Sequence, residues 1–189
     1  FIYFNPMKKL LFFAFLSFMA SCAGENVDKA EQIKKYYTGL KNSDYNQLLD
    51  VIADSLTITE GDYVMEFDRE TYYEQFKWDS VFQPDYKVIS VENLNGEFTA
   101  KVAVESLRFE FLKNNPLTCA HRFHFDAGKI KKIENLDCED ANWQIWTQER
   151  DSLVNWIKQN YPELDGFIND LSMKGAQNYL RAIALYQKR

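Results

Sequence analysis

Only two histidines occur in the 189 residues, His121 and His124, and they are the first side chains to consider for proton transfer or metal binding. Imidazole titrates near neutral pH and is the commonest metal ligand in proteins. The two residues lie three positions apart in an alternating segment, which predicts opposite faces of one strand. They therefore cannot share a metal ion, and we predict no metal site. A histidine that is only hydrogen-bonded within the sheet is the alternative for each.

Two further features could form a ligand site. Arg108 lies in a predicted strand over residues 98–112, on the same face as Val102 and Val104, where it could select an anionic ligand or simply be a paired surface charge. Aromatic residues crowd the predicted helix over residues 69–82, namely Tyr72, Tyr73, Phe76, Trp78 and Phe82. They suit an apolar pocket, although aromatic residues on a helix facing a sheet commonly form core.

Several common functions have no support in the sequence. There is no G-x-S-x-G, no glycine-rich phosphate loop, no H-E-x-x-H and no C-x-x-C. These motifs position catalytic nucleophiles, nucleotide phosphates and zinc. The protein is also acidic, with a formal net charge of −6, whereas binding of nucleic-acid phosphates requires clustered lysine and arginine. We therefore predict no cofactor and no nucleic-acid partner.

The N-terminal segment predicts export and lipidation. Residues 7–22 read MKKLLFFAFLSFMASC, with a cationic start, a short apolar run and small residues before Cys22. This is the pattern of a signal peptide, and its end resembles a bacterial lipobox. We expect residues 1–21 to be upstream sequence and signal peptide, Cys22 to be acylated, and residues 22–27 to tether the protein to a membrane of the bacterial envelope. An ordinary signal peptide that contains a cysteine is the alternative.

Cys119 and Cys138 fall in one predicted β-hairpin, in a compartment that permits disulfides. A turn at residues 126–129 would pair Cys119 with Leu136, so the two cysteines would be diagonal neighbours. That geometry is marginal for a disulfide unless a β-bulge shifts the register. The sequence leaves open a disulfide or two buried thiols.

A packed domain is expected, because 46% of the residues are hydrophobic and only 7 are glycine and 4 proline. Apolar residues at helical spacing predict helices over residues 28–42, 45–53 and 69–82. Between the second and third helices, the β-branched residues 56–60 predict a strand. Residues 63–67 are its candidate partner across a Gly61-Asp62 turn.

The period then changes to that of strands. Residues 86–94, 98–112, 117–125 and 130–136 predict four consecutive antiparallel strands, with Asn95-Gly96 as a hairpin turn. The tail is helical again from Gln148, with Ser172 capping a last helix, and we expect it to pack on the sheet. We divide the chain into an α+β domain over residues 28–140 and a helical extension over residues 141–189.

The element order resembles the nuclear transport factor 2-like superfamily, which includes the SnoaL-like cyclases and ketosteroid isomerase. The resemblance is carried by AEQIKKYYTGLKNSDYNQLLDVIADSLTITEG, by DRETYYEQF and by HRFHFDAGKIKKIENL, which are patterns of hydrophobicity and turns. It implies an α+β fold in which N-terminal helices wrap a cone-shaped, curved antiparallel sheet around a pocket. The additional C-terminal helical segment lies outside the family pattern.

The resemblance also implies site residues. SnoaL-like enzymes tend to use a histidine and a carboxylate, so His121 or His124 with Glu105 or Glu110 is the expected acid–base pair. Ketosteroid isomerase uses a tyrosine and a protonated aspartic acid as an oxyanion hole. Tyr36 or Tyr37 could supply such a tyrosine, but the sequence offers no aspartate at a convincing pocket position.

These features predict a lipid-anchored binding module without enzymatic activity, whose partner is a small apolar ligand or an envelope protein. The expected pocket residues are Tyr37, Tyr73, Phe76, Trp78 and Arg108. A SnoaL-like acid–base enzyme of isomerase, cyclase or dehydratase type is the alternative, and a purely structural envelope component is the third.

Overall fold

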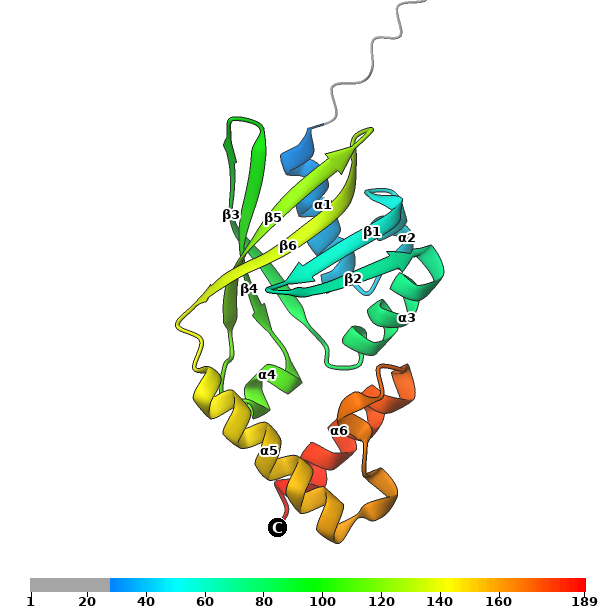
Figure 1. Ribbon diagram of the computed structural model, residues 1–189, viewed down its shortest axis with the longest axis vertical. Coiled ribbons are helices and arrows are strands. Elements are labelled where there is room, and N and C mark those ends of the chain that lie inside the picture. Colours follow the sequence, from blue (N-terminus) through cyan, green and yellow to red (C-terminus); the bar gives the residue numbers. More distant parts are fainter. Residues whose placement is uncertain (1–27) are drawn as a thin grey trace, which may run out of the picture.

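The computed structural model describes residues 28–189, so the predicted signal peptide, Cys22 and the tether lie outside the described residues. The predicted α+β class is confirmed: N-terminal helices pack on a curved sheet, and a helical segment lies beyond its open end (Figure 1). Among residues 28–189, no helix has both the length and the apolar character required to cross a bilayer.

One six-stranded sheet organises the protein, in the spatial order β2-β1-β6-β5-β4-β3. The strands are β1 (Ile52–Glu60), β2 (Tyr63–Asp68), β3 (Asp85–Leu94), β4 (Glu97–Glu105), β5 (Leu117–Asp126) and β6 (Lys129–Glu139). Four pairings are antiparallel, and β1 runs parallel to β6. The predicted four-stranded meander is therefore extended by the β1–β2 hairpin, which joins the edge that β6 would otherwise expose.

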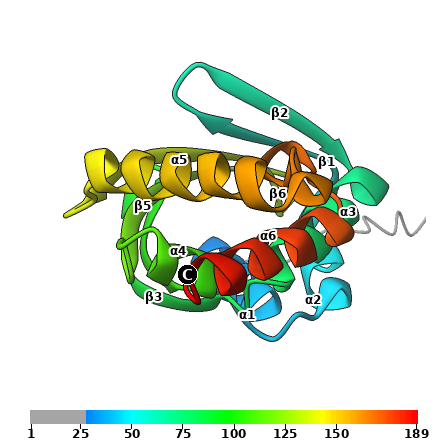
Figure 2. The ribbon, with the colours of Figure 1, turned by 90° about the horizontal axis from the view of Figure 1, so that it is seen from below.

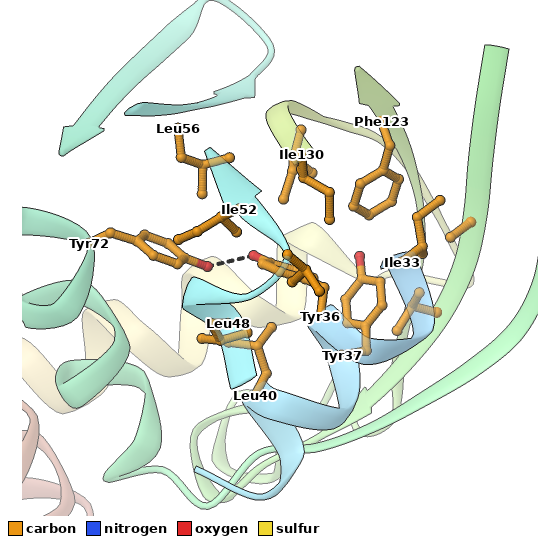
Figure 3. Packing of buried hydrophobic residues seen from close by; sticks show 14 of the residues in the cluster. Ile33, Tyr36, Tyr37, Leu40, Leu48, Ile52, Leu56, Tyr72, Phe123 and Ile130 are labelled. Carbon is orange, nitrogen blue, oxygen red and sulfur yellow. Dashed lines mark hydrogen bonds between the residues drawn. The ribbon is translucent and has the colours of Figure 1, made fainter. Parts of the chain in front are cut away.

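Three helices precede or interrupt the sheet: α1 (Lys29–Lys41), α2 (Tyr45–Leu49) and α3 (Arg69–Ser80). Each begins at an aspartate, because the Asp28, Asp44 and Asp68 side chains accept hydrogen bonds from backbone N–H groups of the first turn. The inner face of α1 buries Ile33, which is 0% exposed. With Leu48 and Ile52 it forms the first hydrophobic core, against the sheet (Figure 3).

The predicted strand over residues 98–112 is wrong beyond Glu105. The chain instead forms the short helix α4 (Leu107–Phe111). Ser106 causes the change, because its Oγ accepts a hydrogen bond from the Phe109 N–H at 3.1 Å and its own N–H donates to Asn115 at 3.0 Å. An alternating apolar pattern does not reveal such a cap. Arg108 and Glu110 consequently lie on a helix rather than on a sheet face.

The C-terminal segment contains α5 (Trp143–Asn160), two short 3₁₀ turns (Pro162–Leu164 and Phe167–Asn169) and α6 (Met173–Tyr186). Seen from below, α5 and α6 cross the open end of the sheet (Figure 2). A second hydrophobic core joins them to Trp78 and Phe82 at the end of α3. The segment therefore packs chiefly on α3 and α4, and not on the sheet as expected, because the break at Ser106 provides a helical surface there.

Cys119 and Cys138 form a disulfide. Two register shifts between β5 and β6, after Cys119 and after His124, account for it. Each shift places one extra residue on β6, which moves the partner of Cys119 from Leu136 to Cys138. The bond closes the hairpin at the end nearest α5.

Candidate functional site

A cavity of about 570 Å³ opens between the inner face of the sheet, α1, α3 and the C-terminal segment. Its lining is mainly aromatic and aliphatic: Tyr36, Tyr37, Leu40, Ile58, Met65, Phe67, Tyr72, Phe76, Trp78, Tyr86, Val104, Phe109, Leu117, Ile133, Leu136, Trp143, Trp146 and Leu171. The polar members are few and include Asp79, Arg108 and His121. Trp143 and Trp146 border this space without filling it, and Trp156 packs in the second core instead.

Two tyrosines from different helices meet at the cavity wall. The hydroxyls of Tyr36 on α1 and Tyr72 on α3 are 2.6 Å apart and share a hydrogen bond (Figure 3). Burial raises the pKa of both phenols, so both are neutral at physiological pH. The pair thus links the two helices and presents hydroxyl groups to an otherwise apolar space.

Asp79 is a carboxyl group on the cavity wall. The Tyr86 hydroxyl donates a hydrogen bond to its Oδ2 at 2.9 Å. Desolvation raises the pKa of Asp79, while the charge of Arg108 and the Tyr86 hydrogen bond oppose that rise. Sequence reasoning missed this residue. A signal was present, because Asp79 follows Tyr72 and Phe76 by seven and three residues and so shares the buried face of α3.

His121 borders the cavity from β5, and its Nδ1 is hydrogen-bonded to the hydroxyl of Tyr37. Burial lowers the pKa of His121 to about 4, so its imidazole is neutral at pH 7. His124 lies on the other face of the sheet, 3.2 Å from Glu134, with 47% of its side chain exposed. Of the two histidines, only His121 is placed to touch a cavity ligand.

Neither predicted acid partner reaches His121. Glu105 is exposed at the end of β4, and Glu110 is exposed on α4 because the strand ends at Ser106. The predicted pairing of a histidine with Glu105 or Glu110 is therefore absent from the structure. The carboxyl groups of the cavity wall belong to Asp79 and Glu60.

The structure gathers four of the five predicted pocket residues at the cavity: Tyr37, Phe76, Trp78 and Arg108. Tyr73 lies outside, with 41% of its surface exposed, and packs against Tyr45 at 4.7 Å between ring centroids. It points away because it is one residue beyond Tyr72, which faces inward on the same helix.

Arg108 stands between aromatic rings. Its guanidinium carbon is 4.8 Å from the ring centroid of Trp78, 5.3 Å from that of Phe82, 5.0 Å from that of Phe109 and 5.9 Å from that of Trp146. These are cation–π distances. Arg108 is neither the strand residue nor the paired surface charge considered from the sequence, and it makes no ion pair within residues 28–189.

No metal-binding group of three or more histidine, cysteine, aspartate or glutamate side chains occurs in the part of the chain that the structure describes. The site is thus an apolar cavity whose wall contains three hydrogen bonds made by tyrosine hydroxyls, the neutral imidazole of His121 and the guanidinium of Arg108 between aromatic rings. Such an arrangement can hold an apolar molecule and orient it by a few polar groups.

No protein-family model matches the sequence, and no curated protein matches it. Solved structures of similar shape include an NTF2-like protein of unknown function from Cytophaga hutchinsonii, with 9% identity, a TM-score of 0.46, and coverage of 58% of this chain and 89% of that one. Another is a proposed polyketide cyclase from Streptomyces antibioticus, with 13% identity, a TM-score of 0.49, and coverage of 64% and 99%.

An uncharacterised cystatin-fold protein from Novosphingobium aromaticivorans is also similar, with 11% identity, a TM-score of 0.48, and coverage of 58% of this chain and 98% of that one. Similarity at this level carries no argument about ligand or reaction. The fold defines the class: an α+β protein with a curved sheet and an aromatic-lined cavity beneath its helices.

Proposed function

We propose that this protein binds a small, mainly apolar organic molecule in the cavity and releases it unchanged. The observation that carries the proposal is the cavity of about 570 Å³ with its aromatic lining. Ligand pockets of proteins typically measure about 300–1,000 Å³ and combine apolar walls with a few polar groups. Three pairs of polar side chains in the wall already bond to each other: Tyr36 to Tyr72, Tyr37 to His121 and Tyr86 to Asp79. These groups therefore need no reacting substrate to satisfy their hydrogen bonds.

A fluorescence titration tests this proposal with the neutral apolar dye N-phenyl-1-naphthylamine, whose emission rises in an apolar environment. We expect saturable binding to the full chain. Ile58→Trp would place a larger side chain into the cavity from β1 and weaken dye binding at least tenfold. Thr57→Trp is the matched control, because neighbouring residues of a strand point to opposite faces. Absence of saturable binding, or equal binding by both variants, would overturn the proposal.

An acid–base enzyme acting on a small organic substrate is the second candidate function. It is favoured by the position of His121, whose imidazole borders the cavity beside the Tyr37 hydroxyl, although burial makes it a weaker base than a free histidine. Proton NMR in D₂O tests it with the simple ketone 2-tetralone, whose α-protons exchange when a base enolises it. Faster exchange with the wild-type chain than with His121→Gln would support an enzyme, and equal exchange would count against this candidate.

The same proposal includes the family and the location of the protein. The order of helices and strands, with a cavity between them, supports a place in the nuclear transport factor 2-like superfamily. Met19-Ala20-Ser21-Cys22 supports lipidation of Cys22 and a position on a bacterial envelope membrane. Fractionation of cells tests the anchor: wild-type protein should sediment with membranes and Cys22→Ser should not. Recovery of Cys22→Ser in the membrane fraction would refute it.

A further inference from the structure

Arg108 is held in a fixed position at the cavity. Its guanidinium lies 4.8 Å from the Trp78 ring centroid on one helix and 5.9 Å from the Trp146 ring centroid on another. A guanidinium packed between aromatic faces loses much of its freedom before a ligand arrives. The cation is therefore preorganised, which reduces the entropy lost on binding.

The same guanidinium lacks a polar partner. Among residues 28–189, no carboxylate lies within 4.0 Å of Arg108, and its side chain takes part in no hydrogen bond. Its nitrogen atoms are also not among the fully buried polar atoms that lack a partner. The donors therefore have access to the solvent of the cavity that Arg108 lines. A partly buried cation whose donors have no protein acceptor favours an anion at that position.

Other charges near the cavity do not supply that anion. Two acidic residues lie in the wall, Asp79 and Glu60. Asp79 accepts a hydrogen bond from Tyr86, and neither carboxylate lies within 4.0 Å of Arg108. The protein as a whole carries a net charge of −6, which repels anions in general. Selective binding of an anion would thus have to come from a local group, and Arg108 is placed for it.

We propose that the natural ligand is a small organic acid, an apolar body that carries one carboxylate or sulfonate, and that Arg108 binds the acid group while the aromatic cavity encloses the body. This inference rests on the proposed binding function and deepens it. A planar guanidinium can donate two parallel hydrogen bonds to such a group.

Two matched dyes separate the acid group from the apolar body. 8-Anilino-1-naphthalenesulfonate and N-phenyl-1-naphthylamine share one ring system, and only the first carries a sulfonate. We expect the wild-type full chain to bind the sulfonate dye at least tenfold more tightly, a factor equivalent to about 1.4 kcal/mol. Arg108→Gln should remove that preference, so that it weakens binding of the sulfonate dye at least tenfold more than binding of the neutral dye. Arg108→Lys, which keeps the charge and loses the fork, should keep part of the preference.

Arg181→Gln is the control, because Arg181 is exposed on α6 and its loss changes the net charge equally. It should leave both affinities unchanged. The inference is overturned if the wild-type chain shows no preference for the sulfonate dye, a result that requires no variant to fold. It is also overturned if Arg108→Gln weakens both dyes equally, since the residue would then only shape the cavity.

The two proposals fail in different ways. If the neutral dye binds and Ile58→Trp weakens its binding, but the sulfonate dye binds independently of Arg108, only the organic-acid inference is wrong. If neither dye shows binding that depends on Ile58, the binding function itself is wrong.

Discussion

Acidification from pH 7.5 to pH 5 should destabilise the folded protein, because His121 takes up a proton more readily in the unfolded chain than in the fold. Burial lowers the pKa of this histidine from 6.5 to about 4 in the folded state, while the unfolded chain keeps the ordinary value. Between these two values the unfolded state binds more protons than the folded state, so stability falls as the pH falls. At about 1.4 kcal/mol per pKa unit, lowering the pH from 7.5 to 5.0 removes at most about 2 kcal/mol through this one group.

Urea denaturation at the two pH values measures this effect as the change in the free energy of unfolding. Because carboxyl groups also contribute to the pH dependence, the informative quantity is the difference between wild type and His121→Gln. We expect the variant to lose less stability than wild type on acidification. His124→Gln removes an exposed imidazole on the opposite face and serves as the control for loss of a histidine. Identical pH dependence in wild type and His121→Gln would refute the assigned burial of this imidazole.

Three further predictions concern stability. Cys138→Ser should lower the free energy of unfolding by about 3 kcal/mol, because the disulfide spans a separation of 19 residues; an equal urea midpoint for oxidised wild type and variant would contradict it. Ser106→Ala should cost about 1 kcal/mol through loss of the α4 cap, read as a lower melting temperature, and no shift would show that the cap contributes nothing. Gly175→Ala should destabilise the start of α6, because the new Cβ would collide with the backbone oxygen of Asp170. A melting temperature equal to wild type would contradict this, since the backbone at Asp170 would then move aside without cost.

Local patterns were sufficient to predict most of the elements. Apolar residues at helical spacing marked α1, α2 and α3, and the Asn95-Gly96 turn marked the β3–β4 hairpin. Period-two alternation marked β5 and β6. Local patterns could not predict the register of the strands or which strands pair. The disulfide depends on two bulges, and the parallel pairing of β1 with β6 joins segments that are far apart in the sequence.

The candidate site was less predictable than the fold, since a site depends on tertiary position. Arg108 was recognised as a cation that could meet a ligand, yet it was placed on a strand because Ser106 also fits an alternating pattern. Asp79 was overlooked because the crowd of aromatic residues on α3 obscured which face of the helix is buried. The hydrogen bonds of the cavity wall, such as that of Tyr36 to Tyr72, join different elements, and no spacing rule identifies them.

The parallel contact between β1 and β6 has a consequence for biosynthesis. Both strands of the β1–β2 hairpin leave the ribosome, or a secretion channel, well before β6 does. Until Lys129–Glu139 has emerged, the hairpin has no neighbour on the side that β6 will occupy, so sheet completion has to wait for nearly the whole domain. A nascent chain of this protein thus keeps an unpaired strand edge, which chaperones can bind, until late in its synthesis. The helices α5 and α6 are added last.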